Sequence, residues 1–349
     1  WFMCACTVAV AGVTGAVGQE FLKLLDERNF PATQYKFLAS SRSAGKTLDF
    51  RGKTYTIEEL TENSFGDVDI GLIGVPWDSG TTNRAGPRHG PRQLRDASTM
   101  IRAQHSISGM RPFEAVNCAD LGDAPVNPMD IMESLDLITG FYNQLSKKGI
   151  MPLSAGGDHL VSFPILRALG RNGPVGMIHF DAHTDMNDAY FGDSKYTHGT
   201  PFRRAIEQGF LDPKRTIQIG IRGVKYETTD FDWALDQGVR IVEIEELFER
   251  GVDDVMQETR EIVGDDETYV SFDIDGIDPA YAPGTGTPEI GGFSTFQAQQ
   301  MVRALTGLNL IGADLVEVSP PFDPSGGTAW VGASIMFELL CVLVQSRNR

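Results

Sequence analysis

The sequence predicts an α/β protein with a doubly wound, mainly parallel sheet that carries helices on both faces. From about residue 68 to the end of the 349-residue chain, short apolar runs rich in β-branched residues alternate with helical patterns. Gly and Pro clusters follow several of these runs. Loops at the carboxyl ends of parallel strands are where such sheets hold their binding sites, so the polar residues of interest should lie there.

The predicted strands are the apolar runs that are bounded by turn residues. They cover residues 69–75, 150–154, 175–180, 216–221, 269–274 and 311–316. The predicted helices lie between them, where apolar residues recur at helical spacing. They cover residues 130–148, 163–169, 201–207 and 295–305.

Composition and charge limit the classes of function. With 41% hydrophobic residues, the chain can bury one large domain, or one large and one small. Its 30 Lys and Arg against 47 Asp and Glu give a net charge of −17, which argues against nucleic-acid binding and suits a cationic substrate.

The cysteines and the apolar segments indicate the cellular compartment of the protein. The cysteines show neither metal-ligand nor disulfide-framework spacing, which favours a reducing interior. They are Cys4, Cys6, Cys118 and Cys341. No run is expected to reach the length of a membrane span, and the apolar N-terminus lacks the basic flank of a secretory signal. We therefore expect a cytoplasmic protein with no membrane partner.

Asp and His residues follow three of the predicted strands. The segments are Gly-Gly-Asp158-His159, Asp181-Ala-His183-Thr-Asp185 and Ser-Phe-Asp273-Ile-Asp275-Gly. In extended backbone, residues two apart point to the same side, so the acidic and imidazole groups of each segment can converge. Five carboxylates around one point would repel one another unless about two divalent cations compensate them. Carboxylate-rich ligation favours Mn²⁺ over Zn²⁺.

The three segments, in this order and at these separations, resemble the signature motifs of the ureohydrolase (arginase) family. The resemblance runs from about residue 67 to the C-terminus and includes GVPWDSGTTNRAGPRHGP and TGTPEIGG. It implies an arginase/deacetylase-like fold, two Mn²⁺ per chain and a homo-oligomer, a trimer or a hexamer. It also implies two ligand sets that share Asp181 and Asp273 as bridges. These sets are His159, Asp181, Asp185 and Asp273 for one metal, and Asp181, His183, Asp273 and Asp275 for the other.

Two further residues fit hydrolysis of a guanidino group. Two cations that share a bridging solvent would lower its pKa from about 15.7 towards neutrality and present hydroxide to the guanidinium carbon. Glu317, after the last predicted strand, can form a charge-assisted bidentate pair with a planar guanidinium. His198, in a Gly-bearing loop, can relay a proton to the leaving amine. The resemblance implies the same two roles. We expect no chemistry from His179 in the sheet interior, or from His89 and His105 in loops or on the surface.

Two stretches of the sequence bear on the tail of the substrate. The arginase loop that reads an α-amino acid is replaced here by FGDSKYTHG, and the THGTPFRRA stretch resembles agmatinases and enzymes that split 4-guanidinobutanoate or 3-guanidinopropanoate. Of these, the ω-guanidino acid enzymes resemble the chain most closely, with agmatine as the alternative substrate. A carboxylate tail would need a donor, and the candidates are Asn83, Arg84, Arg88 and Tyr190.

Residues 8–70 follow a different pattern. Gly12, Gly15 and Gly18 lie between an apolar strand and a helix start, an arrangement that can hold a pyrophosphate at a helix N-terminus. With the Ser and Arg segment near Arg42, this stretch resembles the NADP-binding part of aspartate-semialdehyde dehydrogenases, which implies an NADP-dependent oxidoreductase as a function of another class. The nucleophilic cysteine motif of that family is absent downstream.

The two resemblances meet at residues 67–70. We therefore expect a partial Rossmann-like segment over residues 1–66 and a ureohydrolase domain over residues 67–349. Such a junction indicates a fusion, an engineered hybrid or a mis-assembled sequence.

Overall fold

The computed structural model describes residues 7–30, 32, 34–61, 64, 68–225 and 227–349. The chain forms two compact units, which we call the small unit (residues 1–68 and 111–119) and the large unit (residues 69–110 and 120–349). Cys4 and Cys6, and residue 67 at the expected junction, lie outside the described residues.

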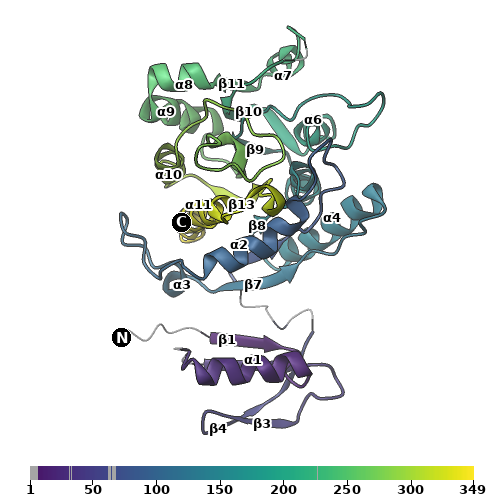
Figure 1. Ribbon diagram of the computed structural model, residues 1–349, viewed down its shortest axis with the longest axis vertical. Helices are drawn as coiled ribbons and strands as arrows, with labels where there is room; N and C mark the ends of the chain where they lie inside the picture. The colour runs from purple at the N-terminus through teal and green to yellow at the C-terminus, as the bar shows by residue number, and fades with distance from the viewer. Residues whose placement is uncertain (1–6, 31, 33, 62–63, 65–67, 226) are drawn as a thin grey trace. The chain divides into compact units, whose positions relative to one another are not determined.

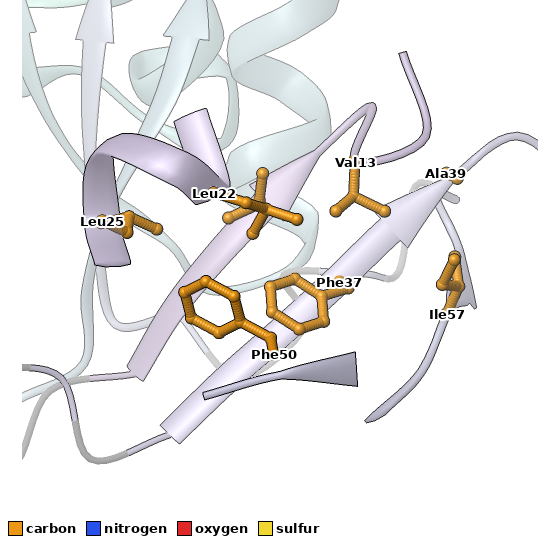
Figure 2. Close-up of a cluster of buried hydrophobic side chains, with 8 residues drawn as sticks. Val13, Leu22, Leu25, Phe37, Ala39, Phe50 and Ile57 are labelled. Atoms are coloured by element: carbon orange, nitrogen blue, oxygen red, sulfur yellow. The ribbon is translucent and has the colours of Figure 1, made fainter. Parts of the chain in front are cut away.

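The small unit is a strand, helix and strand arrangement. Strands β1 (Thr7–Ala11) and β2 (Gln34–Ala39) pair in parallel, and helix α1 (Ala16–Glu27) connects them. The remaining strands of the unit are β3 (Thr47–Phe50), β4 (Lys53–Thr56) and β5 (Glu58–Glu59). Figure 2 shows its apolar core, which includes Leu22 and Leu25 from the helix and Phe37 from β2. The small parallel sheet confirms the Rossmann-like character predicted for this segment.

The glycines of the small unit's first turn are required by its geometry. Gly12 has φ of +69°, a conformation that residues with a Cβ atom rarely adopt. A Cβ atom at Gly18 would clash with the carbonyl oxygen of Gly12. Gly15 is the N-cap of α1. The predicted strand, glycine turn and helix are therefore present.

The large unit is built on an eight-stranded sheet with the order β11-β10-β9-β12-β13-β8-β6-β7. Every pair from β11 to β6 is parallel. The strands are β6 (Ile70–Gly74), β7 (Cys118–Asp123), β8 (Met151–Ala155), β9 (Val175–Phe180), β10 (Leu211–Ile221), β11 (Arg240–Glu243), β12 (Thr268–Asp273) and β13 (Leu310–Val316). All residues of β9 and of β12 are buried, as expected of central strands that are covered on both faces.

Helices cover both faces of this sheet, which confirms the doubly wound fold. Figure 1 shows α9, α10 and α11 on one side of the sheet and α4 and α6 on the other. Ser294 and Gln297 form a capping box that starts α10. The helices of the large unit are α2 (Gly90–Ser98), α4 (Ile131–Lys147), α5 (Ser162–Leu169), α6 (Pro201–Glu207), α7 (Asp232–Gln237), α8 (Ile244–Arg250), α9 (Val252–Val263), α10 (Thr295–Arg303) and α11 (Gly327–Arg347). The short helix α3 (Pro112–Ala115) belongs to the small unit.

The expectation that no run reaches the length of a membrane span was wrong for α11. This helix has 21 residues and, by length and composition alone, is apolar enough to cross a bilayer. However, 67% of its apolar stretch is buried inside the protein, where it packs on β13, α2 and α10. An apolar helix that is buried on most of its surface is the usual core element of a large α/β unit.

The strand order brings distant segments of the chain together. Strands β12 and β13 insert between β9 and β8, so β9, β12, β13 and β8 are neighbours. Because these strands are parallel, the loops that follow them leave the same edge of the sheet. The Asp and His segments of the sequence are the beginnings of these loops.

Candidate metal centre and active site

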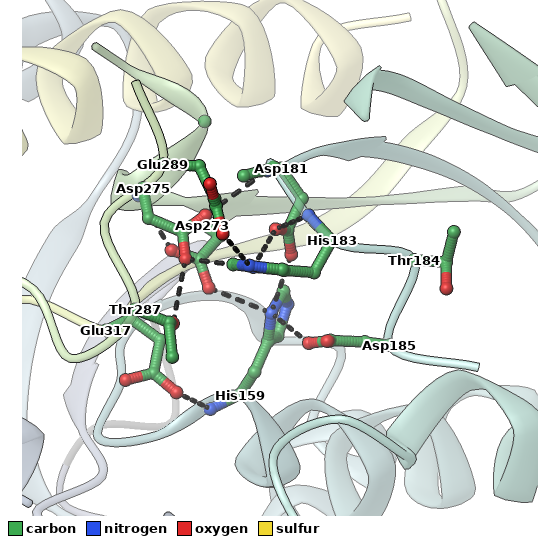
Figure 3. Close-up of polar contacts among 12 residues, drawn as sticks. His159, Asp181, His183, Thr184, Asp185, Asp273, Asp275, Thr287, Glu289 and Glu317 are labelled. Atoms are coloured by element: carbon green, nitrogen blue, oxygen red, sulfur yellow. Dashed lines mark hydrogen bonds and ion pairs between the residues drawn. The ribbon is translucent and has the colours of Figure 1, made fainter. Parts of the chain in front are cut away.

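All six side chains predicted to bind metal gather at the carboxyl ends of the central strands. His159 begins a short 3-10 helix after β8, and Asp273 ends β12. Figure 3 shows the group, whose members are His159, Asp181, His183, Asp185, Asp273 and Asp275. Most of these side chains are buried, and His183 is partly exposed.

The first cluster surrounds the imidazole of His159. Its Nδ1 lies 3.1 Å from Asp181 Oδ2, 2.8 Å from Asp185 Oδ2 and 3.1 Å from Asp273 Oδ2. This buried nitrogen makes no hydrogen bond within the described part of the chain. Neighbouring ligand atoms of a cation with bonds of about 2.1 Å are about 3.0 Å apart in octahedral geometry. The spacing of His159 Nδ1 from each of the three carboxylates therefore suits a shared metal ion, and the ligand atoms of His159, His179 and Asp181 all lie within 4.8 Å of one another.

The second cluster surrounds the imidazole of His183. Its Nδ1 lies 3.1 Å from Asp275 Oδ2 and 3.5 Å from Asp181 Oδ1. The ligand atoms of these three residues all lie within 4.8 Å of one another. Because one oxygen of Asp181 faces His159 and the other faces His183, this carboxylate can bridge two metal ions.

The electrostatics of the clusters favour cations. Burial, and then the charges of Asp275 and Asp181, raise the pKa of Asp273 well above its ordinary value. Burial and the charge of Asp181 also raise the pKa of Asp275. Divalent cations would remove both the repulsion and the cost of burying these charges. The donor set thus fits a pair of hard cations.

Two site residues have a backbone conformation that is rare outside glycine. Asp185 has φ of +51° and Glu317 has φ of +62°. Such residues are strained, and strained backbone is found most often at functional sites. The backbone N–H of Glu317 donates to the carbonyl of Gly157 at 2.9 Å, which fixes the turn after β13. Both left-handed residues thus lie in the turns that carry the site's carboxylates.

Glu317 and His198 lie together beside the two clusters of candidate metal ligands around His159 and His183, which we call the metal clusters. Glu317 Oε1 lies 3.0 Å from His198 Nδ1 and accepts a hydrogen bond of 3.0 Å from the backbone N–H of His159. Glu317 Oε2 is buried and has no hydrogen-bond partner among the described residues. A buried, unpartnered carboxylate oxygen is costly unless a ligand satisfies it.

A cavity of about 260 Å³ connects these groups. It is lined by His183, Asp185, His198, Glu289 and Glu317, among other residues. The unpartnered oxygen of Glu317 and both metal clusters can therefore act on a small molecule in the same space.

The four candidate donors for a carboxylate tail differ in their positions. Tyr190 lines the cavity, and its hydroxyl accepts a hydrogen bond from Asn187. Arg84 stacks on Phe322, at 3.9 Å from the ring centre. Arg88 is paired with Asp78, and Asn83 is exposed. Of the four, the cavity brings only Tyr190 to the site.

Sequence reasoning missed several residues that support the site. His179 is fully buried, as expected of a residue in the sheet interior, and its Nε2 also lies 2.8 Å from Asp181 Oδ2, so it contacts a candidate metal ligand. Thr82 contacts His198 Nε2 through its hydroxyl at 2.9 Å. Thr287 donates to Asp275 Oδ2 at 3.1 Å. The only signal for His179 was a histidine two residues before Asp181 in an otherwise apolar strand.

The other histidines lie away from the metal clusters. His89 is exposed, as expected. His105 lies in a loop, but it is buried rather than on the surface, because its Nε2 contacts Glu338 at 2.9 Å.

Fold and site together define a class of protein: a parallel α/β protein with two neighbouring clusters of side chains that can hold metal ions. The model of the arginase family matches residues 68–341. The chain belongs to the arginase family, whose members are binuclear metal enzymes, and it is an amidinohydrolase. This confirms the family resemblance of the motifs.

Individual relatives are similar to the same part of the chain. A guanidinopropionase of Pseudomonas aeruginosa is 61% identical over 282 residues, which cover 81% of this chain and 89% of the relative. A guanidinobutyrase of the same organism is 49% identical over 277 residues, with coverages of 79% and 86%. The solved structure of proclavaminate amidinohydrolase from Streptomyces clavuligerus superposes with a TM-score of 0.77 at 38% identity, covering 80% of this chain and 93% of that one.

The N-terminal segment matches a different model. The NAD-binding domain of semialdehyde dehydrogenases matches residues 7–90. This range contains the turn formed by Gly12, Gly15 and Gly18, which the sequence predicts to bind a dinucleotide. None of the residues that form the metal clusters belongs to the small unit.

Proposed function

We propose that the protein is a Mn²⁺-dependent hydrolase that splits an ω-guanidino acid, 3-guanidinopropanoate or 4-guanidinobutanoate, into urea and an amine. The observation that carries this proposal is Glu317 Oε2, a buried oxygen beside the two metal clusters that has no hydrogen-bond partner in the described part of the chain. A guanidinium is planar, cationic and rich in N–H donors, so it is the group that such an oxygen can bind.

The ligand sets follow from the two clusters. His159, Asp181, Asp185 and Asp273 would hold one Mn²⁺. Asp181, His183 and Asp275 would hold the other, and the family resemblance of the motifs adds Asp273 to this second set. One imidazole and several carboxylates per metal favour Mn²⁺ over Zn²⁺. When bound, the metal pair supplies an acidic water whose pKa falls from about 15.7 towards neutrality.

Glu317 binds and orients the substrate. Its Oε1 is held by His198 and by the backbone N–H of His159, so the carboxylate is fixed at the wall of the cavity with Oε2 left to bind a ligand. A guanidinium that donates to Oε2 would lie with its carbon beside the metal clusters. Holding the reacting atoms in this way lowers the barrier because their orientation is fixed before the reaction.

His198 moves the proton that the leaving amine needs. Burial lowers the pKa of His198, but its hydrogen bond to Glu317 and the charge of Glu317 raise it, to about 9. The imidazole is therefore protonated near neutral pH and can act as a general acid. Thr82 serves both protonation states: its hydroxyl can accept from Nε2–H, and its backbone N–H can donate to the bare Nε2 at 3.3 Å.

The relatives support a guanidino acid as substrate. The chain is more similar to the guanidinopropionase, at 61% identity, than to the guanidinobutyrase, at 49%. Tyr190 lines the cavity and can donate its hydroxyl proton to a carboxylate. Agmatine, whose tail is a cation, remains the alternative substrate.

The test is urea release by the purified full chain loaded with Mn²⁺. We expect the highest kcat/KM with 3-guanidinopropanoate or 4-guanidinobutanoate, and lower values with agmatine and arginine. Asp275→Asn should abolish turnover. Asp278→Asn is the matched control, because Asp278 accepts only backbone N–H groups at a nearby turn. Protein that holds two metals and releases urea from none of the four compounds would refute the proposal.

A further inference from the structure

A row of polar residues crosses the middle of the large sheet. Gln218, His179, Ser271, Asp314 and Ser154 are in register on five adjacent strands, β10, β9, β12, β13 and β8. Each of these side chains is fully buried. The interior of a parallel sheet is normally apolar, and buried polar groups are costly unless they are hydrogen-bonded. These five side chains should therefore be hydrogen-bonded within the sheet interior.

Asp314 has the most hydrogen bonds in this row. Its Oδ1 accepts from the hydroxyl of Ser271 at 2.7 Å. Its Oδ2 accepts from the hydroxyls of Ser162 and Tyr269 at 2.7 Å and 2.8 Å. Burial, and then the charge of Asp314, raise the pKa of Tyr269 well above its ordinary value, so this hydroxyl keeps its proton and remains a donor. Asp314 is thus a buried carboxylate that three hydroxyl groups satisfy.

Ser271 connects Asp314 to the metal cluster. The Ser271 hydroxyl has one hydrogen, and it donates that hydrogen to Asp314. Its oxygen, 2.9 Å from His159 Nε2, can therefore only accept there. It follows that His159 carries its proton on Nε2 and leaves Nδ1 as a bare lone pair. That nitrogen is the one that faces Asp181, Asp185 and Asp273.

We propose that Asp314 is a positioning residue that acts through Ser271 to hold His159 in its metal-binding tautomer and orientation. The inference rests on the binuclear site of the proposed function and adds a group that touches neither metal nor substrate. A carboxylate that polarises the far N–H of a ligating imidazole raises the basicity of the other nitrogen. Loss of such outer partners typically weakens metal binding about 10-fold to 100-fold.

The arrangement also predicts an asymmetry between the two metals. The chain of contacts from Asp314 ends at His159, whereas His183 contacts Asp275 and Glu289 through its two ring nitrogens. The metal beside His159 should therefore depend on Asp314, and the metal beside His183 should not.

The test is a titration of metal-free full chain with Mn²⁺ alone, followed by electron paramagnetic resonance and calorimetry. Ser271→Ala and Asp314→Asn should each weaken one of the two sites about tenfold and leave the other within about twofold of wild type. Ser162→Ala is the matched control. It removes a hydrogen bond of the same length, 2.7 Å, from the same carboxylate without interrupting the path to His159, so it should leave both sites unchanged. Tyr269→Phe should behave like Ser162→Ala.

The outcomes separate a positioning role from a structural one. If Ser162→Ala weakens metal binding as much as Ser271→Ala does, or if Asp314→Asn weakens both sites equally, the carboxylate merely stabilises the fold and the inference is wrong. Melting temperatures of the metal-free variants show whether each one folds. If wild type binds no metal pair, the proposed function fails. If wild type binds two metals and no variant shows the asymmetry, only the positioning role fails.

Discussion

His198 Nδ1 lies 3.0 Å from Glu317 Oε1, and both side chains are buried beside the metal clusters. The two residues are 119 positions apart in the chain. The contact occupies one oxygen of Glu317 and leaves the other free, so one pair of residues defines both a proton donor and a guanidinium acceptor.

Glu317→Gln should lower kcat/KM for the best guanidino substrate roughly a hundredfold, because removing one partner of a buried charge pair costs about 3 kcal/mol. The glutamine can still accept from the backbone N–H of His159, so metal binding should be retained. The measurements are urea release and metal content on the same preparation. A variant that keeps both metals and full activity would show that Glu317 does not bind the substrate.

The ion pair between His198 and Glu317 should also make the free energy of unfolding depend on pH. Burial lowers the pKa of His198, but the hydrogen bond to Glu317 and the charges of Glu317, Asp185 and Asp158 raise it from 6.5 to about 9 in the folded protein. A raised histidine pKa contributes stability that is complete below about pH 6.5 and is lost as the pH rises through about 9. The difference in melting temperature between wild type and His198→Gln should therefore shrink across this window. A difference that stays constant from pH 6 to pH 10 would contradict the ion pair.

The gathering of the candidate metal ligands could be predicted from sequence because their spacing is local. Asp181, His183 and Asp185 follow one strand, and alternation along extended backbone is enough to bring them together. The central strands were predicted for a similar reason, since apolar runs such as β9 are buried on both faces. The edge strand β7 was missed because most of its side chains are partly or fully exposed and it lacks an apolar run.

The buried polar residues that contact the candidate metal ligands from within the sheet could not be predicted, because their contacts depend on strand order. His179 and Ser271 are in register only because β12 lies beside β9, and Asp314 joins them only because β13 lies beside β12. No local pattern carries this information. A histidine in an apolar strand is usually a satisfied core residue, so His179 gave no functional signal before its distance to Asp181 was known.

Metal removal should destabilise the large unit, and more so at higher pH. Without cations, burial and the charges of Asp275 and Asp181 raise the pKa of Asp273. A carboxyl group whose folded pKa is raised favours the folded state when protonated, so the metal-free protein should lose stability as the pH rises through that pKa. The gap in melting temperature between Mn²⁺-loaded and chelated protein should widen from pH 5 to pH 8. A gap that narrows over this range would mean that the carboxylates are not held close together without metal.

The last prediction concerns the two units. Phe37 is 1% exposed in the core of the small unit, and Phe37→Ala should cost that unit about 3–5 kcal/mol. The metal ligands, Glu317 and His198 all belong to the large unit, so urea release and metal stoichiometry should remain at wild-type values. Phe272→Ala is the matched control, because Phe272 is fully buried in β12 next to Asp273, and its loss should reduce activity. If Phe37→Ala abolished urea release while Mn²⁺ binding persisted, the packing of the small unit would be a requirement for catalysis, and the large unit could not be regarded as the complete enzyme.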